Sequence, residues 1–377
     1  MECRITKDEL LEALYLAQGI ADRRVTLPVL AHVLIHVGPR EVEVLATDQE
    51  IGLRRKCTIS SGKRGSATAN ARVFYDIVRS LGEGDIELSV NERNQLDIRQ
   101  GKAQFRILGV DPEEFPAMPA SAGAASKGAL AIDAEVLRRM LELTLFAASS
   151  DEARPALCGV YLERRDGALH LVASDGHRLS LVKRALKGVR PEGGVILSRK
   201  AVNEMMKVLD AASGEVQLAF GTGVVFLTAG DVELAMRTVQ ADFPSYDAVI
   251  REESPLVARI SNGQWNQSLR RVALVAEEQN HGVRFSFSPG KLELSAKNPG
   301  LGEAREDLDV DYSGDAFSIG FNAKYILEVL NLLAPDHVVE VGMLDDESPT
   351  LLRSPEEPDF LYVVMPMRLP GEYRGNV

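Results

Sequence analysis

The chain has 377 residues, of which 45% are hydrophobic and 26% charged, a composition typical of folded proteins rather than of disordered or membrane-spanning ones. At roughly 150 residues per domain, this length predicts two or three domains. The net charge is −12, from 43 Lys and Arg against 55 Asp and Glu. Because phosphate binding depends on Lys and Arg, a protein coated with nucleic acid is excluded, and any DNA contact must be confined to one basic face.

The amino terminus, MECRITKDELLEALYLAQGI, carries charged residues throughout and lacks the apolar core of a secretory signal. No window approaches the ~18 apolar residues that a membrane-spanning helix needs. We therefore expect a cytoplasmic protein without a membrane partner. Cys3, Cys57 and Cys158 are far apart and the six histidines are scattered, so we predict buried free thiols, no metal site and no cofactor.

In chain order, the first third of the sequence predicts a helix (TKDELLEALYLAQGI, 6–20), two alternating strands (30–47) and a second helix (NARVFYDIVRSL, 70–81). The loop EEFPAMP (113–119) follows, and the Ala, Ser and Gly-rich segment at 120–129 predicts a linker. Phe74, Ile77, Val78 and Leu81 form one apolar stripe on the second helix.

The same order recurs twice. The second copy has predicted helices over 133–149 and 198–210, strands over 157–174 and the loop ADFPSYD (241–247). The third follows a second linker, REESP (251–255), with predicted helices over 261–278 and 322–333 and strands over 281–298. Asp48, Asp175 and Asn298 stand at equivalent places, each after the second strand of its copy.

Three repeats at this period indicate one supersecondary unit used three times. We predict an α+β fold of three similar domains, each with two helices and antiparallel sheets, over 1–122, 128–250 and 256–377. The third domain includes the tail 370–377.

Several segments are similar to one family. The sequences VTLPVLAHVLIHV, ASDGHRLSLV, DFPSYDAVI and above all YVVMPMRL resemble the bacterial DNA polymerase III beta subunit, the replicative sliding clamp. The resemblance extends from the first helix to Leu369. It implies a head-to-tail homodimer whose six domains form a ring, with helices lining the hole and sheets outside. Such a protein catalyses no reaction, encircles double-stranded DNA without sequence preference and tethers the replicative polymerase.

The resemblance also implies a hydrophobic groove between the second and third domains that binds short peptides of partners. These partners would be the polymerase III alpha subunit, the clamp loader, other polymerases and repair proteins. The two methionines suit a groove that accepts several ligands. The matching positions are Arg154, Leu157, Ser174, Gly176, His177, Arg178, Leu179, Pro244, Val249, Asn322, Tyr325, Val363, Val364, Met365, Pro366, Met367 and Arg368.

Weak phosphate contacts are expected from basic residues of the predicted inner helices, with Arg24 and Arg199 first because they match family positions that touch DNA. The other candidates are Arg138, Arg139, Lys200, Lys207, Arg270, Arg271 and Lys324. The alternative for each is an ordinary solvated helix face.

The dimer seam implied by the resemblance has an apolar pair from the third domain, Leu274 and Val275, facing Phe105 and Ile107 of a second chain. Around it, acidic residues would face basic ones. The acidic set is Glu303, Glu306 and Asp307, and the basic set is Arg99, Lys102 and Arg106.

This sequence departs from the family at several positions. Asp151, Pro155 and Ala156 replace the polar or aromatic residues of a DNA-contacting loop, and Ala248 stands where Arg is common. Eight residues, Pro370 to Val377, follow the position at which many family members end.

Two alternatives to a replicative clamp are a hydrolase and a specialised clamp paralogue. Asp175 and His177, two apart on an extended segment, could form a hydrolase pair, but no nucleophile elbow or phosphate loop accompanies them. Asp48 recurs without a histidine two residues later, which favours a structural role for the aspartate. A specialised or inhibitor-tolerant paralogue of the clamp would keep the same groove, so the sequence leaves that alternative open.

Overall fold

The protein was analysed as a computed structural model, which describes residues 1–21, 27–118, 129–188, 193–251 and 254–369. The chain divides into two compact units. Unit 1 comprises Met1–Arg138, Leu186–Val189 and Lys200–Val239, and unit 2 comprises Arg139–Ala185, Arg190–Arg199 and Gln240–Val377. Nearly all of the predicted linker at 120–129 lies outside the described residues. Within the described ranges, no helix is long and apolar enough to cross a membrane.

Helices form at all six predicted places. They are α1 Lys7–Ile20, α2 Ala71–Ser80, α3 Ala134–Leu145, α4 Arg199–Ala211, α5 Asn262–Ala273 and α6 Ala323–Leu330. The side-chain oxygens of Asn70 and Asn322 accept hydrogen bonds from the N–H groups of Val73 and Lys324, so both asparagines are N-caps. The apolar stripes are buried as predicted, with Phe74 and Val78 fully inside.

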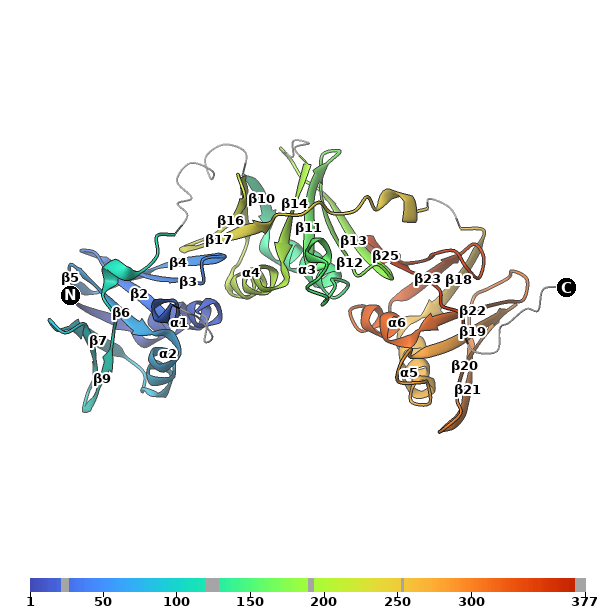
Figure 1. Cartoon of the computed structure of the whole chain (residues 1–377), viewed down its shortest axis with the longest axis horizontal. Coiled ribbons are helices and arrows are strands. Elements are labelled where there is room, and N and C mark those ends of the chain that lie inside the picture. Colours follow the sequence, from blue (N-terminus) through green and yellow to red (C-terminus); the bar gives the residue numbers. More distant parts are fainter. Residues whose placement is uncertain (22–26, 119–128, 189–192, 252–253, 370–377) are drawn as a thin grey trace. The chain divides into compact units, whose positions relative to one another are not determined.

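Unit 1 contains two antiparallel sheets, with α1 and α2 side by side (Figure 1) and α1 packed on β3 and β4. The first sheet has the order β5 Ser61–Lys63, β1 Glu2–Thr6, β7 Asp85–Val90, β8 Gln95–Gln100 and β9 Ala103–Leu108. The second runs β10 Leu130–Asp133, β15 Glu215–Gly221, β16 Val224–Ala229, β17 Val232–Val239, β4 Ile51–Thr58, β3 Glu41–Thr47, β2 His32–Val37 and β6 Gly65–Asn70.

Unit 2 repeats this plan, with α5 and α6 side by side (Figure 1). One sheet has the order β14 Gly193–Ser198, β11 Gly159–Arg165, β12 Ala168–Ser174, β13 Arg178–Ala185, β25 Glu357–Val364, β24 Thr350–Ser354, β23 Val338–Met343 and β18 Leu256–Ser261. The other has the order β21 Gly302–Asp309, β20 Lys291–Asn298, β19 Gly282–Ser288 and β22 Phe317–Asn322. Trp265 of α5 is 1% exposed and meets the ring of Phe285 edge to face, at 6.2 Å between ring centroids.

Two strand pairings join neighbouring repeats. In unit 1, β17 of the second repeat pairs with β4 of the first, with Leu234 opposite Leu53. In unit 2, β13 of the second repeat pairs with β25 of the third, with Leu181 opposite Leu361. Because backbone hydrogen bonds continue across both borders, the compact units do not coincide with the three repeats.

Candidate functional site

The segment Ser174–Arg178 forms the tight turn between β12 and β13. One carboxylate oxygen of Asp175, Oδ1, accepts hydrogen bonds from the N–H groups of His177 (2.9 Å) and Arg178 (3.1 Å). The Ser174 hydroxyl donates to the carbonyl of Arg178 (2.7 Å) and accepts from the N–H of Gly176 (3.1 Å). Gly176 has φ +92°, which a residue with a Cβ adopts only with strain. Asp175 therefore fixes the backbone of the turn.

The first repeat has the same turn. Asp48 Oδ1 accepts from the N–H groups of Glu50 (2.9 Å) and Ile51 (2.6 Å), and the Thr47 hydroxyl repeats the bonds of Ser174. This confirms the structural interpretation of Asp175.

The geometry of the turn argues against the hydrolase hypothesis. Asp175 Oδ1 is used by the backbone and Oδ2 by the Nε of Arg178 (3.0 Å). A catalytic histidine needs a carboxylate that orients its ring. Here the exposed His177 donates its backbone N–H to Asp175, and this bond leaves the imidazole ring unoriented.

Arg178 is the buried support of this turn, since its side chain is 7% exposed. Beyond Asp175, its guanidinium donates to Glu328 of α6 (2.5 Å) and to the carbonyl of Phe146 (2.9 Å). It also lies 4.5 Å from the ring centroid of Tyr325. Arg178 is one of the positions predicted for the groove, but its guanidinium donates to groups within the chain, so it holds β13 against α6.

A hollow of about 180 Å³ lies beside the turn, wholly within unit 2. Its lining consists of Leu157, Ser174, Gly176, His177, Arg178, Leu179, Phe243, Pro244, Ser245, Tyr246, Val249, Val363 and Met365. Most of these residues were predicted for the groove. We refer to this hollow as the groove.

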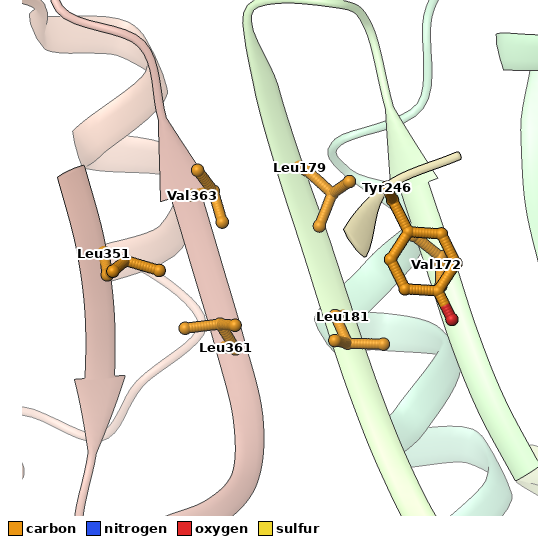
Figure 2. Close-up of a cluster of buried hydrophobic side chains, with 7 residues drawn as sticks. All are labelled: Val172, Leu179, Leu181, Tyr246, Leu351, Leu361 and Val363. Atoms are coloured by element: carbon orange, nitrogen blue, oxygen red, sulfur yellow. The ribbon is translucent and has the colours of Figure 1, made fainter. Parts of the chain in front are cut away.

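The floor of the groove is formed by the paired strands β13 and β25. Leu179 lies opposite Val363 and Leu181 opposite Leu361, and Figure 2 shows these side chains together with Tyr246. All belong to one buried apolar cluster with Val172 and Leu351. The apolar floor favours a ligand with bulky aliphatic or aromatic side chains.

The wall opposite β25 is an aromatic stack that the sequence did not reveal. Tyr161 stacks on Phe243 at 4.8 Å with an angle of 3° between the ring planes, and Phe243 meets Tyr246 edge to face. A Cβ at Gly194 would lie 2.3 Å from the ring of Tyr161, so this glycine makes room for the stack. Phe243 and Tyr246 lie in a loop, where no periodic pattern predicts that they pack on Tyr161 of β11.

Polar groups hold Tyr246 from behind. Its hydroxyl donates to Glu163 and lies 3.2 Å from His170 Nδ1. Burial, and then the charge of Lys183, lower the pKa of His170 below its usual value, although Glu163 opposes the shift. Burial and the bond to Glu163 raise the pKa of Tyr246. Tyr246 is therefore a neutral hydrogen-bond donor at ordinary pH.

The C-terminal segment links the turn to the other sheet of unit 2. Met365 is 37% exposed, and its N–H donates to the carbonyl of His177 (2.8 Å). The N–H of Met367 donates to the carbonyl of Gly320 on β22 (2.8 Å). A Cβ at Gly320 would lie 2.4 Å from the carbonyl oxygen of Met367, so only glycine allows this approach.

The remaining residues predicted for the groove lie around it rather than in its lining. Arg154 donates to Asp151 and to the carbonyl of Asp175, Asn322 caps α6, and Val364 is buried. Arg368 pairs with Glu347 (2.8 Å), and Tyr325 lies under Arg178. Pro366 lies half-buried in the segment between Met365 and Met367.

Most of the predicted DNA-contacting cations that the structure describes have side-chain partners within the chain. Arg24 lies outside the described residues. The ion pairs are Arg138–Asp210, Arg139–Glu357, Lys200–Asp48, Lys207–Glu204 and Arg271–Glu306. Arg199 donates to the carbonyl of Ala148, and Arg270 to the side chains of Asn266 and Asn331. These side chains are partly exposed, for example 42% for Lys200, so phosphate would compete with carboxylates for them.

The predicted seam residues lie on two separate sheet edges and the end of α5. β9, with the half-buried Phe105 and Ile107, is the last strand of its sheet in unit 1, and β21 is the last strand of the four-stranded sheet in unit 2. Leu274, just after α5, is 78% exposed, and Leu108 of β9 is 72% exposed. Val275 is half-buried.

Most of the charged residues of the predicted seam form ion pairs within the chain, whereas no ion pair of Arg99 or Lys102 is found among the described residues. Glu306 accepts bonds from Arg271 and Ser268, Glu303 pairs with Lys297, and Arg106 donates to Asp97. We expected Glu306 to face cations of a second chain, whereas the structure gives it a partner on α5. The apolar residues are therefore the available part of the predicted seam.

Comparison with known proteins identifies relatives over nearly the whole chain. Family models of the DNA polymerase III beta subunit match at residues 1–119 (N-terminal domain), 131–245 (central domain) and 248–368 (C-terminal domain). The beta sliding clamp of Caulobacter vibrioides is 32% identical over 376 residues, covering 98% of this chain and 100% of the relative. The beta sliding clamp of Pseudomonas aeruginosa is 31% identical over 374 residues, with the same coverage.

Solved structures agree. The DNA polymerase III subunit beta from Pseudomonas aeruginosa superposes with a TM-score of 0.92 at 31% identity, covering 98% of this chain and 100% of that one. The beta subunit from Thermotoga maritima gives a TM-score of 0.90 at 30% identity, covering 98% and 99%.

Proposed function

The chain belongs to the DNA polymerase III beta subunit family, the beta sliding clamps, and on that premise we propose that it forms a ring around duplex DNA and tethers the replicative polymerase. The observation that carries the proposal is the groove of unit 2, because it supplies an apolar site through which a partner can be held. The protein performs no reaction of its own in this function.

The groove is the proposed site for short peptides of the polymerase alpha subunit, the clamp loader, other polymerases and repair proteins. The apolar floor would take bulky Leu or Phe side chains, while His177 and the backbone at Gly176 supply polar edges. The exposed Met365 at the rim can change rotamer to admit different ligands.

Ring closure is proposed to use the free edges of β9 and β21 in a head-to-tail homodimer. A terminal strand offers unpaired backbone groups, and the exposed Leu108 and Leu274 offer apolar area. A head-to-tail contact closes into a ring only when the rotation between the two chains is right.

Retention on DNA is proposed to be topological rather than chemical. The cations of α3, α4 and α5 are neutralised in part by Asp210, Glu204 and Glu306, which would keep phosphate binding weak enough for sliding. The net charge of −12 fits this arrangement.

The direct test is retention of purified protein, loaded by its clamp loader, on nicked circular DNA. We expect the protein to remain on the circle through gel filtration and to be released when a restriction enzyme linearises it. Equal retention on linear DNA would contradict the topological mechanism. Support of processive synthesis by its own replicase would further distinguish the replicative clamp from a specialised paralogue.

A further inference from the structure

A second, larger hollow of about 580 Å³ lies in unit 2 on the sheet that forms the floor of the groove. It is lined by Leu181, Lys183, Ile250, Arg251, Glu340, Arg353, Ser354, Pro355, Pro358, Asp359, Phe360 and Leu361. We call it the second hollow. None of the functions assigned above uses it.

The second hollow lies on the same face of β13 as the groove. Leu179, Leu181 and Lys183 alternate along β13 and therefore share a face, with Leu179 lining the groove and Lys183 the second hollow. At about 3.3 Å per residue, the two ends are roughly 13 Å apart, which an extended peptide of about four residues spans.

A single short element separates the two sites. The 3-10 turn η4, Asp247–Val249, lies between them, with Val249 lining the groove and Ile250 lining the second hollow. Ala248 at the centre of this turn is exposed and small. A chain bound in the groove therefore meets no large side chain at Ala248 as it crosses to the second hollow.

The second hollow offers an excess of positive charge to a ligand. Its two carboxylates are already paired with cations outside the lining, Glu340 with Arg259 (2.8 Å) and Asp359 with Arg184 (2.8 Å). Lys183, Arg251 and Arg353 have no carboxylate partner among the ion pairs of the described residues.

Arg251 has spare hydrogen-bonding capacity. Its Nη2 donates to the carbonyl of Pro349, while its Nε is buried and has no partner among the described residues. Arg353 donates to the carbonyl of Arg251 (3.2 Å) rather than to an acid. An arriving carboxylate would thus find donors without displacing an existing ion pair.

We propose that the second hollow binds an acidic segment of the same partner peptide that occupies the groove, placed about four residues from its apolar anchor. This proposal rests on the proposed function of the groove. The apolar walls from Leu181, Ile250 and Leu361 suit a peptide, whose side chains include both carboxylates and methylene groups.

The test uses the full chain and synthetic peptides in calorimetry. A core peptide containing Gln and a Leu-Phe pair is compared with versions that carry Gly-Ser-Asp-Glu-Asp or Gly-Ser-Asn-Gln-Asn at either end. At low salt, the acidic extension at one end should lower Kd about three- to tenfold relative to the neutral one. The difference in Kd between the acidic and neutral extensions should vanish at about 0.5 M salt, because salt screens the partly exposed charges of the ligand.

Variants identify the residues. In the double variant Lys183→Gln/Arg353→Gln the acidic and neutral extensions should bind equally, while the core peptide keeps its Kd. The control Lys63→Gln, an exposed lysine on β5 in unit 1, should keep the gain.

The outcomes separate the two proposals. Equal affinity of acidic and neutral extensions at both ends, on the unmodified chain, would overturn this inference alone. Failure of the core peptide itself to bind would overturn the proposed groove and this inference with it.

Discussion

The turns at 47–51 and 174–178 have the same backbone hydrogen bonds but different surroundings. In both, an Asp accepts hydrogen bonds from the N–H groups two and three residues later, and a hydroxyl closes the turn. The strand that follows each turn pairs with a strand of another repeat, β4 with β17 and β13 with β25. The first and second repeats therefore share the same turn and the same kind of strand pairing.

The difference lies in the side chains on that geometry. After the first turn stands Gly52, and a Cβ there would lie 2.7 Å from the methyl carbon of Met118, so Met118 fills the space. After the second turn stands Leu179, and the loop position equivalent to Met118 holds Tyr246, which lines the groove. In the first repeat Met118 fills the space beside the turn, whereas in the second repeat the equivalent space remains open as the groove.

The largest expected effect contrasts Arg178 with Ile51, the last residues of the two turns. Arg178→Met should lower the free energy of unfolding by about 3 kcal/mol, because it strands Asp175 and Glu328 without their cation. Ile51→Met should cost only about 1 kcal/mol. Urea unfolding followed by circular dichroism measures both. Adding Glu328→Met to Arg178→Met should recover part of the loss, and no recovery would mean that the ion pair is not the cause.

The second contrast replaces each turn aspartate by asparagine, which keeps one oxygen acceptor. Asp175→Asn should cost about 2 kcal/mol because Oδ2 no longer accepts a charged bond from the buried Arg178. Asp48→Asn should cost about half as much, since its Oδ2 partner Lys200 is 42% exposed. Equal costs would show that both aspartates act through the backbone alone.

The third contrast separates binding from stability. His177→Ala should weaken binding of the core peptide about fivefold, because the groove loses one polar group. The thermal midpoint of the variant should equal that of the unmodified chain. Glu50→Ala, at the equivalent position of the first turn, serves as the control and should change neither. Peptide titration and thermal unfolding provide the two readouts.

The smallest expected effect is a pH dependence of the free energy of unfolding. It comes from His170, which lies behind Tyr246 in the wall of the groove. Burial lowers the pKa of His170 in the folded chain, so the unfolded chain takes up this proton first as pH falls through about 6.5, the ordinary value for histidine. The free energy of unfolding should therefore decline from about that pH toward the folded pKa, and more weakly in His170→Gln. Identical pH profiles for the variant and the unmodified chain would remove His170 from the explanation.

Sequence patterns located the helices because caps and apolar stripes are local signals, as at Asn70 and Phe74. The equivalence of Asp48 and Asp175 was also readable, since it follows from aligning repeats. The commitment of Arg178 to Glu328 was not, because the two residues are 150 positions apart and either could have faced solvent. Nor could the Tyr161–Phe243 stack be foreseen, because it joins β11 to a loop and needs Gly194 on the neighbouring strand β14.

The position of Trp265 makes one part of the molecule optically distinct. It is the sole tryptophan of the chain, and it is buried against Phe285 in the third repeat. Its fluorescence should be blue-shifted in the native protein and should shift to the red only when that repeat opens. The first repeat, which has tyrosines but no tryptophan, can unfold without changing this signal, so emission and circular dichroism together would resolve the order in which the repeats are lost.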